Sequence, residues 1–180
     1  MRVLVTGAAG LFGRAIVPLL RERGHEVFTM DLRSDAGNDH HIAFDLRREQ
    51  PIGMPYDAVV HLAGRRASVA KQHELAADLL LDNLAIDTNV FRAMRAHGVK
   101  RGVYASSVSV YSSAPNEEIS RFMTRGFPEE WAEGRLPDDS VRYSATAKLC
   151  SERAIEAMNL QDGANISVVR LVNTYGPGDT

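Results

Sequence analysis

The sequence predicts one α/β domain over residues 1–180, with a doubly wound parallel sheet between helix layers in a three-layer αβα arrangement. Strand-like and helix-like segments alternate along the whole chain, which is typical of parallel sheets covered by helices. The first apolar run ends in a ladder of glycines, and a helical pattern follows it directly. The 180 residues, of which 44% are hydrophobic, suit a single globular domain with a sizeable core.

The first predicted strand covers residues 3–5 and leads into Gly7, Gly10 and Gly13. The first glycine permits a tight turn that a Cβ atom would obstruct, the second lets backbone amides approach a ligand, and the third lets the next helix pack closely on the sheet. Because free amides and the positive end of a helix dipole face this loop, a diphosphate is the expected occupant. The first gap is one residue longer than in the usual G-x-G-x-x-G motif, so a turn that only packs strand on helix is the alternative.

A helix over residues 11–23, ended by Gly24, and a strand over residues 25–30 are predicted next. Asp31 follows this strand, about where a carboxylate would meet the ribose hydroxyls of an adenosine, and a solvated strand end is the alternative. A carboxylate there repels a 2′-phosphate and so favours NAD over NADP, whereas the nearby Arg33 would receive that phosphate.

Residues 33–39 are interpreted as a polar loop, and residues 41–44 as a short strand that ends at Asp45. Asp45 is a candidate acceptor for the exocyclic amine of an adenine lying across the strand ends. The alternative is that Asp45 is a helix N-cap for the residues from Leu46 onward.

The next buried strand covers residues 56–64 and ends in small residues that leave room for a cofactor. Arg65, Arg66 and Lys71 follow it as a basic run, which we interpret as solvated surface, with phosphate contact as the alternative. A long amphipathic helix is then predicted over residues 73–97.

This long helix ends before Gly98 and carries Asn83 among apolar neighbours. Since a buried amide must find hydrogen-bond partners, Asn83 is expected to brace the neighbouring strand or the cofactor pocket. A surface asparagine is the alternative.

A strand over residues 99–107 ends in Ser106 and Ser107, at the edge where parallel sheets bind ligands. Residues 112–141 are irregular and long for a plain connection, which favours a lid or substrate loop. The remaining predicted elements are a helix over residues 143–158 and a strand over residues 166–172.

Composition narrows the classes of partner and compartment. A net charge of −2 gives no electrostatic case for nucleic acid or an anionic membrane as a partner. The single cysteine, Cys150, excludes a disulfide within the chain and favours a reducing, cytoplasmic setting. No signal peptide, membrane anchor or metal site is predicted.

Together, these motifs resemble the extended short-chain dehydrogenase/reductase family, in particular its nucleotide-sugar epimerase and dehydratase branch, whose cofactor domain has a Rossmann-type fold. The resemblance covers nearly the whole chain and is specific because the motifs occur in the family's order. The matching segments are residues 6–13, Asp31, Asp45-Leu46, residues 61–64, Asn83, residues 98–101, residues 104–107, Tyr143 with Lys148-Leu149, and residues 170–178.

The resemblance implies an NAD-dependent enzyme that acts on a nucleotide sugar by transient hydride transfer, with a homo-oligomer as a further expectation. Tyr143 would be the acid/base, Lys148 its partner and a ribose ligand, and Ser107 would hold the substrate oxygen. Asn173 would contact the substrate side. The expected cofactor-binding residues are Gly7, Ala9, Gly10, Leu11, Phe12, Gly13, Asp31, Arg33, Asp45, Leu46, Leu62, Ala63, Gly64, Asn83, Ser106, Tyr143 and Lys148.

The spacing of the tyrosine and the lysine departs from the family pattern. The family places them four residues apart on a helix, whereas Tyr143 and Lys148 are five apart. On an ideal helix a step of four leaves the side chains about 40° apart, and a step of five about 140°. A π-bulge would restore the pair, and we predict such a local irregularity between the two residues. The alternatives are that Tyr143 lies just before the helix or that the pair is broken.

The family also continues past the last matching motif into a smaller substrate domain, and nothing follows Thr180 here. A truncated chain, a natural protein with the cofactor domain alone, and a site closed by a partner chain are all compatible with this. A dinucleotide-binding module without turnover is therefore the alternative to an epimerase or dehydratase. The predicted strand order is 3-2-1-4-5-6, with the first strand in the interior of the sheet.

Overall fold

The chain folds around one sheet of six parallel strands, as a computed structural model shows for residues 1–35, 38, 40–48, 56–111, 140–172 and 174–176. The strand order is β3-β2-β1-β4-β5-β6, so the predicted order and the interior position of the first strand are confirmed. The strands are β1 (Arg2–Thr6), β2 (Glu26–Asp31), β3 (His41–Ala43), β4 (Ala58–His61), β5 (Arg101–Ser107) and β6 (Asn165–Leu171).

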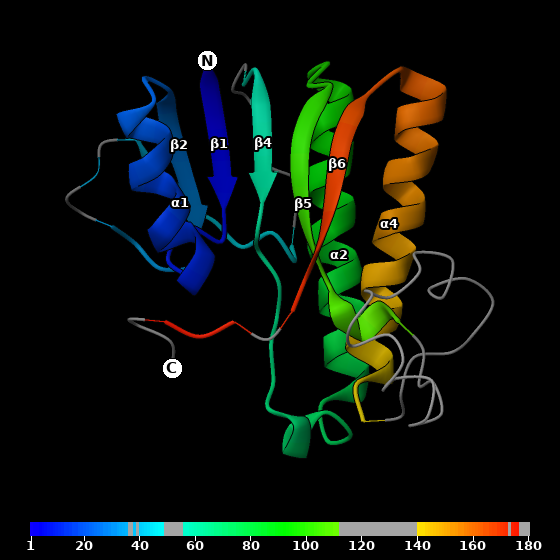
Figure 1. Cartoon of the computed structure of the whole chain (residues 1–180). Helices are drawn as coiled ribbons and strands as arrows, with labels where there is room; N and C mark the ends of the chain where they lie inside the picture. The colour runs from blue at the N-terminus through cyan, green and yellow to red at the C-terminus, as the bar shows by residue number, and fades with distance from the viewer. Residues whose placement is uncertain (36–37, 39, 49–55, 112–139, 173, 177–180) are drawn as a thin grey trace, which may run out of the picture.

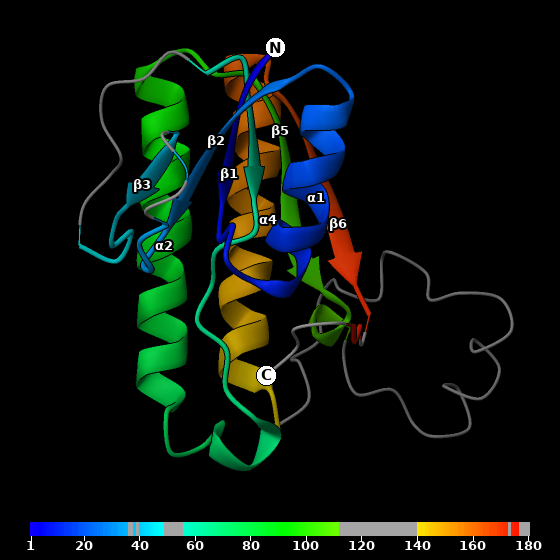
Figure 2. The ribbon, with the colours of Figure 1, turned by 90° about the vertical axis from the view of Figure 1, so that its left-hand side faces the viewer.

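Helices cover the sheet on both faces, which confirms the predicted doubly wound α/β fold (Figures 1 and 2). One face carries α1, and the other carries α2 and α4. The α-helices are α1 (Leu11–Glu22), α2 (Ala76–Ala96) and α4 (Arg142–Asp162), with short 3₁₀ turns η1 (Val69–Lys71) and η2 (Val108–Val110).

Two apolar cores explain why β1 reads as a continuous hydrophobic run. Val3 and Val5 pack with Val17 of α1 on one face. Leu4 points to the other face and joins the larger core, which includes Phe91 of α2. Successive side chains of a strand point to opposite faces, so a strand covered on both sides needs apolar residues at every position.

Glycines follow the helices where the sequence indicates, but the long helix predicted over residues 73–97 spans only Ala76–Ala96. Gly24 and Gly98 follow α1 and α2 with φ angles of 78° and 68°, a conformation that favours glycine. The last helix was predicted to end at Met158 but continues to Asp162, one turn further. Gly163, with φ 61° and ψ 36°, is the residue that ends it.

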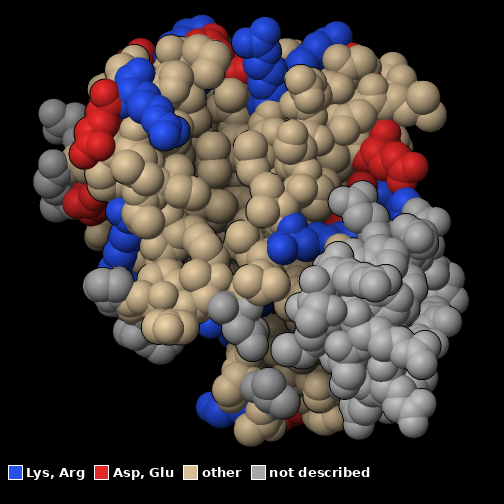
Figure 3. All heavy atoms as spheres, in the orientation of Figure 1, with Lys and Arg blue, Asp and Glu red and all other residues tan. Residues whose placement is uncertain are grey.

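Beyond α1, the sheet face on that side is open in the part of the chain that the structure describes. Val103 of β5 and Val169 of β6 lie on this face and are 38% and 43% exposed. Figure 3 shows the same face, with a wide central area that carries no charged side chain. Most of the predicted lid, residues 112–139, lies outside the described residues. Among the helices described, none combines the length and apolar character needed to cross a lipid bilayer.

Candidate functional site

A pocket of about 970 Å³ lies at the carboxyl ends of the strands. Ligands of open parallel sheets bind at this edge. The pocket is formed by the loops after β1, β2, β3, β4 and β5 together with the first turns of α4. Of the expected site residues it is lined by Gly7, Ala9, Gly10, Leu11, Phe12, Gly13, Asp31, Arg33, Asp45, Leu46, Leu62, Ala63, Gly64, Asn83, Ser106, Ser107 and Lys148.

The turn after β1 has no room for side chains at two of its glycines. Gly7 has a φ of 68°, and a Cβ there would lie 2.6 Å from the backbone nitrogen of Ala63. A Cβ on Gly13 would overlap the backbone of Ala8. The turn therefore packs directly against the loop after β4 and the start of α1. Gly10 is the N-cap of α1 and supplies no side-chain cap, so the first amides of the helix have no side-chain acceptor in the turn.

Asp31 lies at the rim of this turn and is held by two backbone donors. The amide of Ala9 donates to one carboxylate oxygen at 3.0 Å, and the amide of Arg33 donates to the other at 3.2 Å. An ionised carboxylate offers about four acceptor positions, so two backbone bonds leave capacity for ribose hydroxyls. Arg33 also lines the pocket, beside Asp31.

Asp45 is tied to the arginine that follows it rather than capping a helix. The Arg47 side chain donates to both oxygens of Asp45, at 2.9 and 2.8 Å, and the Arg47 amide donates at 3.0 Å. The side-chain hydrogen bond from Arg47 is the main reason why the pKa of Asp45 is lowered to about 2. Residues 46–48 form a turn and not a helix, so Asp45 is not a helix N-cap. The Asp45 carboxylate lines the pocket while it is paired with the Arg47 guanidinium.

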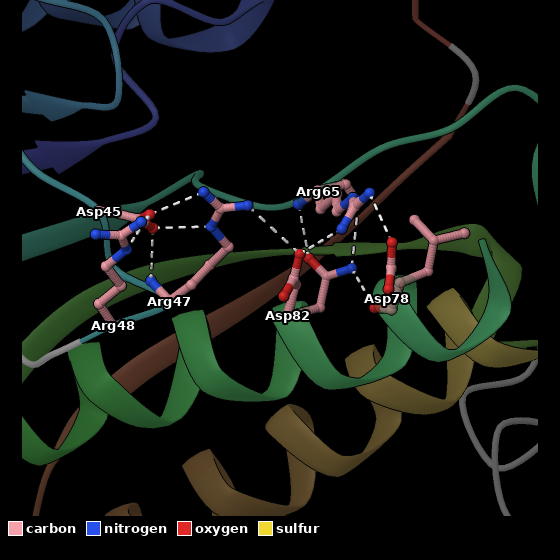
Figure 4. A network of polar contacts seen from close by, with 8 residues as sticks. Asp45, Arg47, Arg48, Arg65, Asp78 and Asp82 are labelled. Carbon is pink, nitrogen blue, oxygen red and sulfur yellow. Dashed lines mark hydrogen bonds and ion pairs between the residues drawn. The ribbon is translucent and has the colours of Figure 1, made fainter.

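Arg65, predicted as part of a solvated basic run, is 31% exposed but belongs to an ion-pair network. Its guanidinium lies 2.6 Å from Asp82 and 3.0 Å from Asp78, both on α2. Arg47 reaches Asp82 at 3.6 Å, so the network continues to Asp45 (Figure 4). The two loops after β3 and β4 are thereby fixed to the same face of α2.

Asn83 braces the loop after β4, as its apolar neighbours in the sequence indicated. Its side-chain oxygen accepts from the amide of Arg65 at 2.8 Å. Its side-chain nitrogen donates to the carbonyls of Arg65 and Leu79, at 3.1 and 2.7 Å. The amide thus holds Gly64 at the pocket wall, where a Cβ would lie 3.2 Å from the Asn83 oxygen.

The two serines that end β5 line the opposite end of the pocket. Ser106 donates to Glu152, which is also paired with Arg170 at 2.7 Å. Ser107 accepts from the Ser109 amide and donates to the Ser109 hydroxyl, both at 3.1 Å. Ser107 is therefore positioned by the turn η2, with its hydroxyl at the pocket surface.

The start of α4 gives a result that differs from the prediction. The helix is α-helical from Arg142 to Asp162, so the expected irregularity between Tyr143 and Lys148 is wrong. Tyr143 lies inside the helix, is 40% exposed and does not line the pocket. The structure thus brings Ser107 and Lys148 to one pocket without Tyr143. Asn173 lies outside the described residues.

Ser144 takes the place in the pocket that was expected for the tyrosine. It precedes Lys148 by four residues, and both line the pocket. The Ser144 hydroxyl lies 3.1 Å from the side-chain oxygen of Gln72 and 3.0 Å from the carbonyl of Val141, with both in reach of its proton. The i, i+4 spacing to Lys148 was a signal for Ser144 in the sequence, whereas nothing indicated Gln72.

Comparisons with known proteins give matches over nearly the whole chain. A model of the NAD dependent epimerase/dehydratase family matches residues 3–180. The dTDP-4-dehydro-6-deoxy-D-allose reductase of a Streptomyces species is 28% identical, over 98% of this chain and 57% of the relative. The chain therefore spans about half the length of the curated relatives that it matches.

Solved structures show the same fold. The UDP-glucose 4-epimerase of Thermus thermophilus, in complex with NAD, is 27% identical with a TM-score of 0.77, and the match covers 100% of this chain and 58% of that one. A GDP-D-glycero-L-gluco-heptose synthase of Campylobacter jejuni, in the presence of NADPH, is 22% identical with a TM-score of 0.81 and coverages of 99% and 49%.

Proposed function

The chain belongs to the NAD dependent epimerase/dehydratase family, and we propose that it binds NAD in this pocket for transient hydride transfer to and from a nucleotide sugar. The observation that carries the proposal is the start of α1, which lines the pocket and whose first amides have no side-chain cap, so that they can bind an anion. Asp31 lies beyond one end of the turn after β1, at the position for the adenosine ribose. Lys148, Ser106 and Ser107 line the far end, at the position for the nicotinamide half.

The residues present fit such a dinucleotide. One continuous pocket of about 970 Å³ is lined by the glycine turn, by Asp31 at its rim, and by Ser106 and Ser107 at its other end, called the serine end below. A Cβ at Gly7 would push the turn away from Ala63, against which it packs, and a Cβ at Gly64 would lie 3.7 Å from the Lys148 nitrogen. The lack of a side chain at Gly64 leaves pocket volume that an extended ligand needs.

The serine end suits a polyhydroxylated substrate. Ser107, Ser109, Ser144 and Gln72 all line it, and each has hydrogen-bonding capacity for sugar hydroxyls. The bound nicotinamide would supply hydride acceptance. Ser107 would hold the reacting oxygen of the substrate by hydrogen bond, and the Lys148 ammonium would bind the neighbouring ribose and stabilise negative charge that develops nearby.

A second candidate function is dinucleotide binding without turnover. The specific observation in its favour is that Tyr143 lies outside the pocket lining while Ser144 stands one turn before Lys148. A serine hydroxyl is a far weaker acid than a phenol and is a poor substitute for a tyrosine acid/base. With this function the chain senses or holds the cofactor.

Calorimetric titration with NAD, followed by a turnover assay on UDP-sugars at saturating NAD, separates these candidates. Binding with turnover supports the enzyme, and binding without turnover supports the binding module. Absence of NAD and NADP binding to a folded chain would overturn both.

Replacing Asp31 with alanine should weaken NAD binding about tenfold or more, because hydrogen bonds to a charged group contribute roughly 1.5–3 kcal/mol. The same change should narrow the gap between NAD and NADP, since the repulsion of the 2′-phosphate is lost. Asp35→Ala, on the exposed loop nearby, is the matched control and should leave both affinities unchanged. Equal or tighter binding of NADP than of NAD by the unmodified chain would contradict the assigned role of Asp31.

A further inference from the structure

Asp87 is a buried carboxylate with no part in the proposed chemistry. It lies in the middle of α2, is 1% exposed and sits beside the apolar core residues Ile86 and Val90. An ionised carboxylate in such a place destabilises the fold by several kcal/mol unless it is paired and hydrogen-bonded. Its position therefore calls for a specific partner.

Four side chains from three other elements converge on Asp87. His61 of β4 lies 2.9 Å from one carboxylate oxygen. Tyr104 of β5 donates to the other oxygen at 2.5 Å, and Ser151 of α4 donates to the same oxygen at 2.7 Å. The nitrogen of Lys148, also from α4, lies 4.0 Å from that oxygen and 4.5 Å from the centre of the Tyr104 ring.

The charges on these groups agree with an ionised Asp87. Burial alone would raise the pKa of its carboxyl, but the Lys148 ammonium and the hydrogen bond from His61 outweigh burial and hold that pKa below its ordinary value. The pKa of Tyr104 is raised, first by burial and then by the Asp87 charge, so its hydroxyl remains a donor. Within the described residues, Asp87 is the one carboxylate within 4.0 Å of the Lys148 nitrogen.

Lys148 is thus held between a buried anion and the pocket. Its side chain is 18% exposed, it lines the pocket, and its nitrogen lies where a side chain at Gly64 would approach it. Without a counter-ion, a flexible lysine side chain would turn toward bulk water, because its ammonium is strongly hydrated.

We propose that Asp87 is a positioning residue that anchors the Lys148 ammonium at the nicotinamide-ribose end of the pocket, acting through the 4.0 Å ion pair. This inference rests on the proposed NAD binding. Asp87 itself is too deeply buried to touch a ligand, so its effect passes through Lys148. The His61, Tyr104 and Ser151 contacts hold the carboxylate in place, and they make it the rigid part of the pair.

The test compares NAD with ADP, which carries the adenosine and diphosphate but not the second ribose. In Asp87→Asn we expect the affinity for NAD to fall about tenfold relative to the affinity for ADP, as measured by calorimetry. A purely structural defect would weaken both ligands together. Lys148→Met should give the same selective loss, and the double variant should lose no more than either single variant, because the two residues act as one unit.

Ser151→Ala is the matched control, since it removes a hydrogen bond to the same oxygen without removing a charge. The charge of Asp87 and its hydrogen bonds with His61 and Tyr104 remain in this variant and still hold the carboxylate, so the ratio of NAD to ADP affinity should change less than twofold. An unchanged ratio in a folded Asp87→Asn variant, with the unmodified chain binding NAD, would overturn the inference while leaving the proposed function intact.

A second measurement tests the ion pair between Asp87 and Lys148 if the Asp87→Asn variant does not fold or if the chain does not bind NAD. In the unmodified chain the lowered pKa of Asp87 contributes stability that is present at neutral pH and is lost as the pH falls through the folded-state pKa. In the Lys148→Met variant the Asp87 carboxylate keeps only His61, Tyr104 and Ser151 around it. Burial should then have the larger effect and raise the pKa of Asp87. As the pH falls from about 7 to about 5, the stability of the variant should therefore rise relative to that of the unmodified chain, because protonation removes the buried charge. Parallel pH profiles of the two unfolding midpoints would show that no anchoring ion pair exists.

Discussion

Replacement of Gly7 by alanine is expected to weaken NAD binding more than 100-fold and to lower the free energy of unfolding by about 2–4 kcal/mol. The φ of 68° is strained for any residue with a Cβ, at roughly 1–3 kcal/mol. The new Cβ would also lie 2.6 Å from the nitrogen of Ala63 and 2.8 Å from the carbonyl carbon of Leu62. Because both are backbone atoms, the loop after β4 must move, and the pocket moves with it.

The Gly98→Ala variant distinguishes the effect of backbone strain at positive φ from the effect of steric contact with the new Cβ. Gly98 has the same φ of 68°, and a Cβ there has nothing within 4 Å. This variant should lose about 1 kcal/mol of stability and keep its affinity for NAD. Calorimetry and denaturant unfolding of the two variants give the comparison. If Gly7→Ala binds NAD as well as Gly98→Ala does, the glycine turn is not the diphosphate site.

The strand order and most of the pocket could be predicted because their signals are local or follow from chain geometry. An apolar run followed by Gly7, Gly10 and Gly13 specifies a strand, a turn and a helix within a short stretch. Once strands and helices alternate, right-handed crossovers leave few possible arrangements of the sheet. The carboxyl ends of the strands then gather at one edge, which places Asp31 and Ser107 on the same pocket.

The partners of charged residues could not be predicted in the same way. Arg65 was taken for a solvated residue because its neighbours in the sequence are also basic. Its partners Asp78 and Asp82 stand four residues apart on α2, so they share a helix face, but only the packing of the loop after β4 brings Arg65 to that face. The partners of Asp87 were even less predictable from the sequence, because they come from three separate elements, β4, β5 and α4.

The role given to Tyr143 came from the family resemblance, and helix geometry argues against it. The resemblance matches a tyrosine to a tyrosine, whereas the regular helix places the residue four before Lys148 in the pocket. That residue is Ser144. The physical period of the helix was therefore the better guide to the pocket than the residue type.

Exchanging the two residues, in the double variant Tyr143→Ser with Ser144→Tyr, should raise turnover on a UDP-sugar about 100-fold at saturating NAD. The phenol would then stand one turn before Lys148 and face the pocket, where an acid/base group typically contributes about 10²–10⁴-fold. Ser144 lines the pocket, and the exchange leaves the composition and the net charge unchanged. The measurement is the rate of sugar conversion together with its pH profile, which should acquire a new ionisation.

Two further variants make the result specific to the hydroxyl and the register. Tyr143→Ser with Ser144→Phe fills the same space without an acid and should not raise turnover. Tyr143→Phe alone should leave turnover as it is, because the Tyr143 ring does not line the pocket. A large loss of turnover in Tyr143→Phe, with no gain in the exchanged variant, would instead mean that α4 shifts its register during the reaction and brings Tyr143 to Lys148. The regular helix from Arg142 to Asp162, fixed by the buried Ala145 and Ala147, argues against such a shift.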